Sequence, residues 1–170
     1  MVLLMVTAAA VGTAGVAHAS VGNAPGYVHL KSVDPGTCID AKYNVPGTQV
    51  VMWRCLNTEF EEWRTVNVSI PGNRYEHCAC ATVTTFVNHA MDLCLAVPSD
   101  TIGSGTAVVQ QTCNPADEKQ WWMWSGSAGA IRTFINLQQT LDVDLGRSDN
   151  GIPLQTWTNY SLRNQQWSTL

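Results

Sequence analysis

Three segments of this 170-residue chain repeat one pattern, and this internal repetition constrains the fold more than any other feature. Each segment ends on a Trp that follows Gln or Glu by two positions, and the three endings are Glu61-Glu62-Trp63, Gln120-Trp121-Trp122 and Gln165-Gln166-Trp167. In the second ending, either Trp121 or Trp122 fits as the closing residue. The pattern indicates one small structural unit used three times.

Two further blocks precede each ending at matching spacing. They are Cys38-Ile39-Asp40 with Val51-Met52-Trp53-Arg54-Cys55, Cys94-Leu95-Ala96 with Val109-Gln110-Gln111-Thr112-Cys113, and Thr140-Leu141-Asp142 with Gln155-Thr156-Trp157-Thr158-Asn159. Short apolar runs alternate with turn signals such as Pro46-Gly47 and Asn150-Gly151, and no stretch has a sustained helical period. A propeller needs at least about four blades. We therefore predict an all-β fold, a single β-trefoil of three repeats with pseudo-threefold symmetry.

The charge and the first residues limit where the protein works. Only 13% of residues are charged and the net charge is -4, which argues against nucleic acid or an anionic membrane surface as the partner. Residues 2–17 are uncharged and mostly apolar, and Ala17-His18-Ala19 fits a signal-peptidase site. We predict a removed signal peptide over 1–19 and a secreted protein, with a retained membrane anchor as the alternative. The predicted mature domain is 20–170, with repeats of approximately 27–68, 69–128 and 129–170.

The repeated Gln-x-Trp endings, with Cys-x-Asp and x-x-Trp-x-Cys blocks before them, resemble the ricin B-type (R-type) lectins and related carbohydrate-binding modules. The resemblance extends from about Tyr27 to Trp167. It implies that the closing Trp of each repeat belongs to the core and that the Gln two positions earlier ties the repeat together. It also implies that Trp53 and Trp157 are ligand platforms, whereas Trp121 and Trp124 are read as ordinary packing.

The third repeat has every residue type that the resemblance assigns to a sugar site. An aromatic face stacks on the C–H groups of a pyranose, a carboxylate accepts from neighbouring hydroxyls, and an amide adds a donor and an acceptor. The predicted main site for galactose-type glycans is Asp142, Gln155, Trp157, Asn164 and Gln165.

The other two repeats depart from this set. The first keeps Asp40 and Trp53, a possible second site, but has Val51, Phe60 and Glu61 where the third has Gln155, Asn164 and Gln165. The second repeat has Ala96 and Gln111 in place of the carboxylate and the platform, so we expect it to bind no sugar.

The six cysteines of a short exported chain indicate disulfides rather than a metal site. Cys38 and Cys55 occupy the repeat positions of Cys94 and Cys113, and both positions change together in the third repeat. We therefore predict the pairs Cys38–Cys55 and Cys94–Cys113. Cys78 and Cys80 have no counterpart, and free, intermolecular and mutually bonded states are all open for them.

We expect a binding protein without a cofactor or an enzymatic activity. Asp142-Val143-Asp144 is expected to place its two carboxylates on opposite faces of a strand, which does not suit glycoside hydrolysis. Glycans are the predicted partners, and oligomeric state is left open. One alternative is a trefoil that acts through protein contact, as an inhibitor or toxin partner. Another is a free-standing module for xylan-type polysaccharides.

Overall fold

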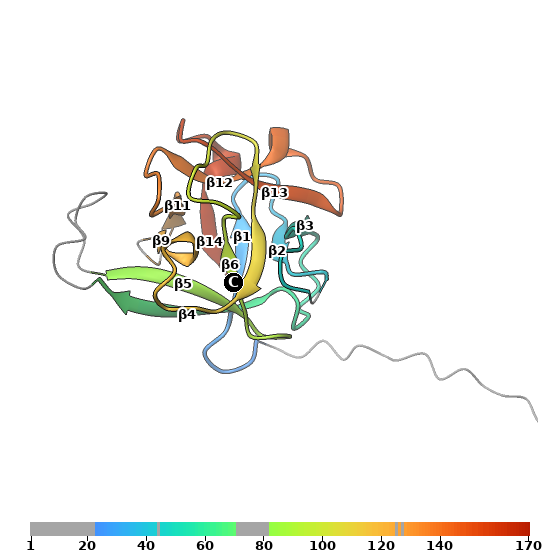
Figure 1. Ribbon diagram of the computed structural model, residues 1–170. Coiled ribbons are helices and arrows are strands. Elements are labelled where there is room, and N and C mark those ends of the chain that lie inside the picture. The colour runs from blue at the N-terminus through green and yellow to red at the C-terminus, as the bar shows by residue number, and fades with distance from the viewer. Residues whose placement is uncertain (1–22, 44, 71–81, 125, 127) are drawn as a thin grey trace, which may run out of the picture.

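The computed structural model describes residues 23–43, 45–70, 82–124, 126 and 128–170, and these residues form strands and short 3₁₀ helices (Figure 1). In chain order the elements are β1 (Val28–Ser32), β2 (Cys38–Asp40), β3 (Val51–Trp53), β4 (Glu62–Ser69), β5 (Thr82–Asn88), β6 (Leu93–Ala96), β7 (Thr106–Ala107), β8 (Val109–Thr112), η1 (Glu118–Gln120), β9 (Trp122–Met123), β10 (Ala128–Gly129), β11 (Arg132–Thr133), β12 (Gln139–Val143), η2 (Asp144–Gly146), β13 (Ile152–Thr158), η3 (Arg163–Gln165) and β14 (Trp167–Thr169). No helix in these described ranges has the length and apolar character that a bilayer span requires.

The strands form one antiparallel sheet that closes on itself. From β1 the pairing runs through β2, β3, β13, β12, β11, β9, β5 and β4, and β4 pairs again with β1. The hairpin of β4 and β5 is the longest pairing, from Trp63 opposite Asn88 to Ser69 opposite Thr82, and Figure 1 shows it as the long green ribbon pair. The prediction of an all-β fold is confirmed.

A ring of backbone hydrogen bonds shows the threefold arrangement directly. The Val50 N–H donates to the Val108 carbonyl at 2.9 Å, the Val108 N–H to the Leu154 carbonyl at 3.0 Å, and the Leu154 N–H to the Val50 carbonyl at 2.9 Å. Each repeat thus donates to one neighbour and accepts from the other, and the ring returns to its start. This closure is the arrangement expected of a β-trefoil.

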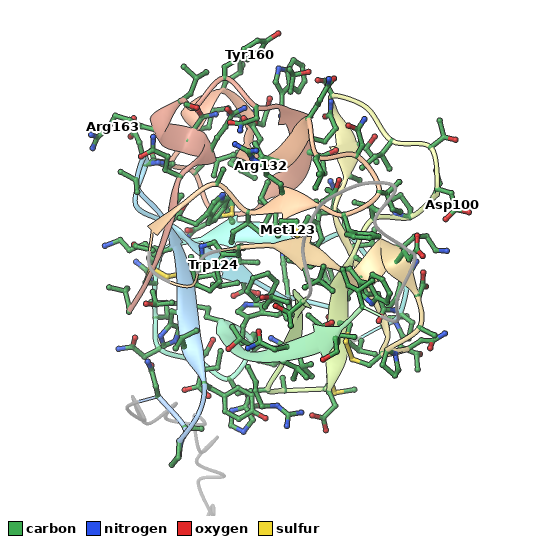
Figure 2. The ribbon with its side chains drawn as sticks, turned by 90° about the vertical axis from the view of Figure 1, so that its left-hand side faces the viewer. Asp100, Met123, Trp124, Arg132, Tyr160 and Arg163 are labelled. Atoms are coloured by element: carbon green, nitrogen blue, oxygen red, sulfur yellow. A yellow bond between two sulfur atoms is a disulfide. The ribbon has the colours of Figure 1, made fainter. Side chains whose placement is uncertain are left out.

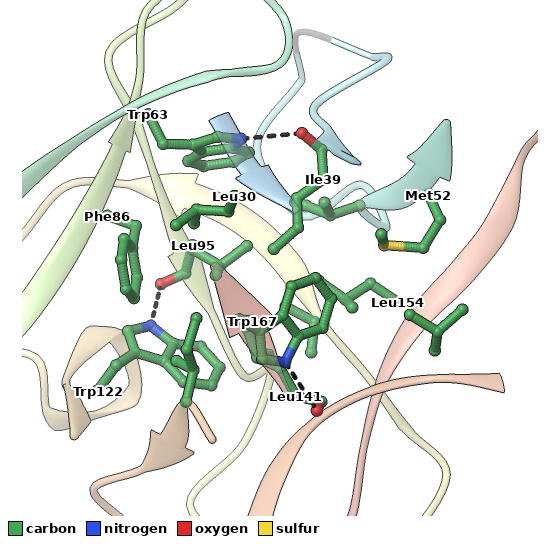
Figure 3. Close-up of a cluster of buried hydrophobic side chains, with 14 of the residues drawn as sticks. Leu30, Ile39, Met52, Trp63, Phe86, Leu95, Trp122, Leu141, Leu154 and Trp167 are labelled. Carbon is green, nitrogen blue, oxygen red and sulfur yellow. Dashed lines mark hydrogen bonds between the residues drawn. The ribbon is translucent and has the colours of Figure 1, made fainter. Parts of the chain in front are cut away.

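Three buried indoles fill the centre in the same symmetric way (Figure 3). Each closing Trp is fully buried and donates its Nε1–H to the carbonyl of a core residue in its own repeat. The pairs are Trp63 with Ile39 at 3.0 Å, Trp122 with Leu95 at 3.0 Å, and Trp167 with Leu141 at 3.2 Å. The closing residue of the second repeat is therefore Trp122, and the ambiguity with Trp121 is resolved.

Trp121 and Trp124 pack as predicted. Trp121 lies in a smaller apolar cluster, with its ring centroid 5.1 Å from that of Phe134 in an edge-on contact. Trp124 is partly buried, and its ring centroid lies 5.6 Å from that of Phe86. Figure 2 shows Trp124 and Met123 on the face turned toward the viewer.

Two predicted disulfides are confirmed, Cys38–Cys55 and Cys94–Cys113. Cys78 and Cys80 lie outside the described residues, as does the predicted signal peptide over 1–19, so both stay predictions.

Candidate functional site

The hairpin of β12 and β13 brings the predicted residues of the third repeat to one face. Asp142 lies opposite Gln155, and Thr140 lies opposite Trp157. Along β13 buried and more exposed side chains alternate, as the period of a strand requires. Gln155 and Trp157 therefore point outward together, on the same face as the Asp142 side chain.

Three amides hold the Asp142 carboxylate in place. Its Oδ1 accepts from Gln155 Nε2 at 3.0 Å, and its Oδ2 accepts from Asn164 Nδ2 and from Gln165 Nε2, each at 3.0 Å. A carboxylate offers about four acceptor positions. These amides use three of them, which leaves a position on Oδ1 for a hydroxyl donor.

Gln165 acts from beneath the site and does not line the cleft. Its side chain is fully buried, its Oε1 accepts from the Tyr160 N–H at 2.8 Å, and its Nε2 also donates to the Thr158 carbonyl at 3.0 Å. The sequence-based prediction places Gln165 beside Asn164 as an amide that contacts the ligand. The structure instead makes it the residue that ties η3 to β13 and fixes Asp142.

The remaining predicted residues line a cleft of about 560 Å³. Its walls are Asp34, Asp142, Asp144, Leu145, Gly146, Gln155, Trp157, Leu162, Arg163 and Asn164. Trp157 is 39% exposed, so part of its indole is open to a ligand. Its Cζ3 is within 3.7 Å of where a Cβ on Gly105 would stand, so the second-repeat loop lies against the indole. Figure 2 shows Arg163 and Tyr160 projecting from this end of the molecule.

The cleft also contains residues that sequence reasoning missed. The expectation that Asp142 and Asp144 point to opposite faces is wrong, because β12 ends at Val143 and the chain turns into η2. Gln155 Nε2 lies 3.0 Å from Asp142 Oδ1 and 3.4 Å from Asp144 Oδ1. Leu145 is 87% exposed at a φ of 51°, a conformation that costs a non-Gly residue about 1–2 kcal/mol. In the sequence, the Leu145-Gly146 pair after Asp144 was the feature that could have indicated this turn.

Burial raises the pKa of Asp142 above its ordinary value, and the hydrogen bonds from Gln155 and Gln165 oppose this shift. The negative charge of Asp144 raises the pKa further, and the bond from Asn164 lowers it. Asp144 is itself paired with Arg147, whose Nη1 lies 3.6 Å from Asp144 Oδ2. The arrangement presents acceptor oxygens beside an open aromatic ring.

Comparison with known proteins identifies the family. The family described as the ricin-type β-trefoil lectin domain matches residues 82–169, just over half of the chain. The protein belongs to the ricin-type β-trefoil lectin family. The match begins within the second repeat and extends through the third, and the hydrogen-bond ring and the buried indoles place the first repeat in the same fold.

Solved structures agree with this assignment. The designed threefold-symmetric protein ThreeFoil is 17% identical with a TM-score of 0.71, covering 85% of this chain and 98% of that one. The C-half of the earthworm R-type lectin in complex with GalNAc is 16% identical with a TM-score of 0.61, covering 85% and 98%. The Macrolepiota procera ricin B-like lectin in complex with lactose is 18% identical with a TM-score of 0.62, covering 88% and 96%. No curated protein sequence matches the chain.

At these identities the structural likeness establishes the β-trefoil, and membership in a lectin family supports carbohydrate binding in general. The disulfides and the lectin domain are also consistent with an extracellular protein.

The first repeat of this ricin-type trefoil retains the framework of the third. Asp40 lies opposite Val51 and Cys38 lies opposite Trp53, which is the register of β12 and β13. The Val51 side chain has no donor, whereas the Gln155 side chain donates to Asp142 at the equivalent position. Among the described residues, Asp40 Oδ1 is buried without a hydrogen-bond partner. Burial raises the pKa of Asp40, and the N–H and the charge of Lys42 oppose the shift.

Glu61 occupies the place of Gln165 and satisfies only half of its role. Its Oε2 accepts from the Leu56 N–H at 2.7 Å, as Gln165 Oε1 does from Tyr160. Its Oε1 is buried and has no hydrogen-bond partner among the described residues, because a carboxylate cannot donate as the Gln165 amide does to Thr158. Burial raises the pKa of Glu61, hydrogen bonds from the backbone N–H groups of Leu56, Thr58 and Asn57 oppose this shift, and the charge of Asp40 adds to it.

We expect Glu61→Gln to raise the free energy of unfolding at pH 7 by about 1–2 kcal/mol, since it supplies the missing donor and removes a buried charge. The raised folded-state pKa means that the native protein binds more protons than the unfolded chain, so its stability falls as the pH rises through that pKa. The gain from Gln should therefore be largest at neutral pH and shrink in acid. Urea unfolding at several pH values measures both, and a gain independent of pH would contradict this explanation.

The second repeat keeps the structural bonds and lacks the ligand groups. Gln120 accepts from the Asn114 N–H at 2.9 Å and donates to the Thr112 carbonyl at 2.9 Å, which repeats the bonds of Gln165. Ala96 is fully buried and has no polar group, and Gln111 stands where the other repeats have a Trp. This copy offers neither the acceptor nor the aromatic platform.

Within the described part of the chain, no cluster of three or more His, Cys, Asp or Glu side chains is placed to hold a metal ion.

Proposed function

We propose that this protein is a secreted lectin that binds galactose-type glycans through the third-repeat cleft and catalyses no reaction on them. The observation that carries the proposal is the Asp142 carboxylate, held by three amides with an acceptor position free, beside a Trp157 ring that is 39% exposed. The carboxylate would accept from a sugar hydroxyl while the indole stacks on the C–H face of the ring.

Galactose suits this arrangement because its axial 4-hydroxyl leaves a continuous apolar patch for stacking. Two lectin structures of the same fold were solved with GalNAc and with lactose, both of which contain a galactose-type ring. Secretion is supported by the two disulfides, since such bonds persist in oxidising compartments. A single shallow site gives modest affinity, and we expect a dissociation constant on the order of 0.1–1 mM.

Titration of the protein with lactose, followed by heat and by tryptophan fluorescence, tests the proposal. We expect Trp157→Ala to weaken binding at least tenfold, which equals about 1.4 kcal/mol, because the stacking platform is lost. The indole is partly exposed, so the variant should keep its fold. Asp142→Asn should also remove binding, since an amide cannot replace the charged acceptor.

The matched control is Gln111→Ala, which changes the equivalent position of the second repeat and should leave lactose binding unchanged. A parallel titration with a xylo-oligosaccharide distinguishes a galactose-binding lectin from a module that binds xylan-type polysaccharides. Lactose binding that survives both Trp157→Ala and Asp142→Asn would remove the third repeat from the proposal. If neither sugar bound, a protein partner would be the better explanation.

A further inference from the structure

The two repeats that keep an Asp and a platform Trp carry opposite charges at one equivalent position. Two residues after Asp142 the chain has Asp144, and two residues after Asp40 it has Lys42. The third-repeat cleft is lined by three carboxylates, those of Asp34, Asp142 and Asp144. The corresponding position of the first repeat instead holds an ammonium group.

Lys42 lies on the platform itself. Its Nζ is 5.0 Å from the ring centroid of Trp53 and 5.0 Å from that of Tyr43, so the charge sits over two aromatic faces. Lys42 and Tyr43 are both exposed. Among the described residues, no carboxylate oxygen lies within ion-pair distance of this Nζ. The ammonium group therefore lies over the two rings and is open to solvent, and the Asp40 carboxylate acts on it only over a longer distance.

The Trp53 platform is otherwise built like that of Trp157. Gly151 of the third repeat donates its N–H to the Met52 carbonyl at 2.8 Å, and a Cβ there would lie 3.7 Å from Trp53 Cζ3. Gly105 stands in the same relation to Trp157. The two platforms therefore differ in what lies over the ring, which at Trp53 is the ammonium group of Lys42.

This difference predicts different ligands. A neutral pyranose that stacks on Trp53 must displace the ammonium and loses the cation–π contact, worth about 0.5–1 kcal/mol when exposed. A sugar with an anionic substituent gives the ammonium a partner instead. The first repeat also lacks the amide of Asn164, because Phe60 stands there, so it has fewer donors for neutral hydroxyls.

We propose that the first repeat is a second carbohydrate site selective for a pyranose with an anionic substituent, a uronate or a sulfate ester, and that Lys42 determines this selectivity. The proposal rests on the proposed function, since it assumes that the trefoil binds sugars. It makes the protein a lectin with two differently charged sites.

The test is an NMR titration of the disulfide-bonded protein that follows the indole N–H signals of Trp53 and Trp157, assigned with Trp53→Phe and Trp157→Phe. The probes are galactose, galacturonic acid and galactose 6-sulfate, with sodium acetate as the control for a bare anion. We expect the acidic sugars to move the Trp53 signal at about fivefold lower concentration than galactose, the size of one exposed ion pair. Comparing the two acidic sugars shows whether carboxylate or sulfate is preferred.

Lys42→Gln should remove this preference, and Lys42→Arg should keep it as the charge-matched control. Lys42→Asp, which copies the third repeat, should reverse it. Equal responses of Trp53 to galactose and to the acidic sugars would overturn the proposal, as would an unchanged preference in Lys42→Gln. A Trp53 signal that no sugar moves, while Trp157 responds to galactose, would overturn it and leave the proposed function standing. If no sugar moved either the Trp53 or the Trp157 signal, both this proposal and the proposed function would be overturned.

Discussion

Replacing Trp167 by alanine is expected to lower the free energy of unfolding by about 3–5 kcal/mol. The indole is fully buried in the central cluster, and its Nε1–H is bonded to the Leu141 carbonyl at 3.2 Å (Figure 3). Its removal leaves a cavity in the core and an unpaired buried carbonyl. Denaturant unfolding followed by circular dichroism measures the loss.

Trp157→Ala is the natural control for this experiment. It makes the same substitution in the same repeat, but its side chain is 39% exposed and is not part of the central cluster. We expect it to change the free energy of unfolding by less than about 1 kcal/mol. Similar losses in the two variants would contradict the division of the tryptophans into core and platform residues.

The second large effect is expected at the disulfides. Cys38–Cys55 closes a loop of 17 positions and Cys94–Cys113 a loop of 19. In the chain-entropy model each cross-link stabilises the fold by about 3 kcal/mol, because it restricts the unfolded chain. Replacing both cysteines of one pair by serine should lower the melting temperature by roughly 6–12 °C.

Adding a reductant to the unmodified protein should lower the melting temperature further than either double substitution does, because it opens both loops. The variant without Cys38 and Cys55 serves as the control for the variant without Cys94 and Cys113, since the two loops are nearly equal in length. If a double variant melted at the temperature of the unmodified protein under non-reducing conditions, the predicted stabilisation would be wrong.

The sequence was sufficient for the parts of the fold that repeat. The Gln-x-Trp endings and the paired loss of cysteines in the third repeat lie at fixed spacings, so the trefoil, the closing tryptophans and two disulfides could be predicted. Adjacent Trp121 and Trp122 could not be separated in this way. Only the bond from Trp122 to the Leu95 carbonyl shows which indole points to the core.

The roles of the site residues were harder to predict, because the sequence shows the type of each side chain but not how deeply it is buried. Asn164 and Gln165 are neighbouring amides, and both donate to Asp142 Oδ2, yet only Asn164 lines the cleft. Asp144 was misplaced because a strand was assumed to continue past Val143. Lys42 follows β2 and Trp53 ends β3, so no pattern of neighbouring residues predicts the contact between them.

The loop around Gly105 gives the second repeat an importance that its own lost ligand groups would not suggest. Gly105 donates its N–H to the Thr156 carbonyl at 2.8 Å, the Thr156 hydroxyl donates to the Gly103 carbonyl at 3.0 Å, and Ser104 Oγ accepts from the Thr158 N–H at 3.0 Å. These bonds fix the strand at Thr156 and Thr158, the residues immediately before and after Trp157. A second repeat that is expected to bind no sugar therefore still has a structural role in this loop, because the loop supports the strand of the neighbouring repeat that carries Trp157.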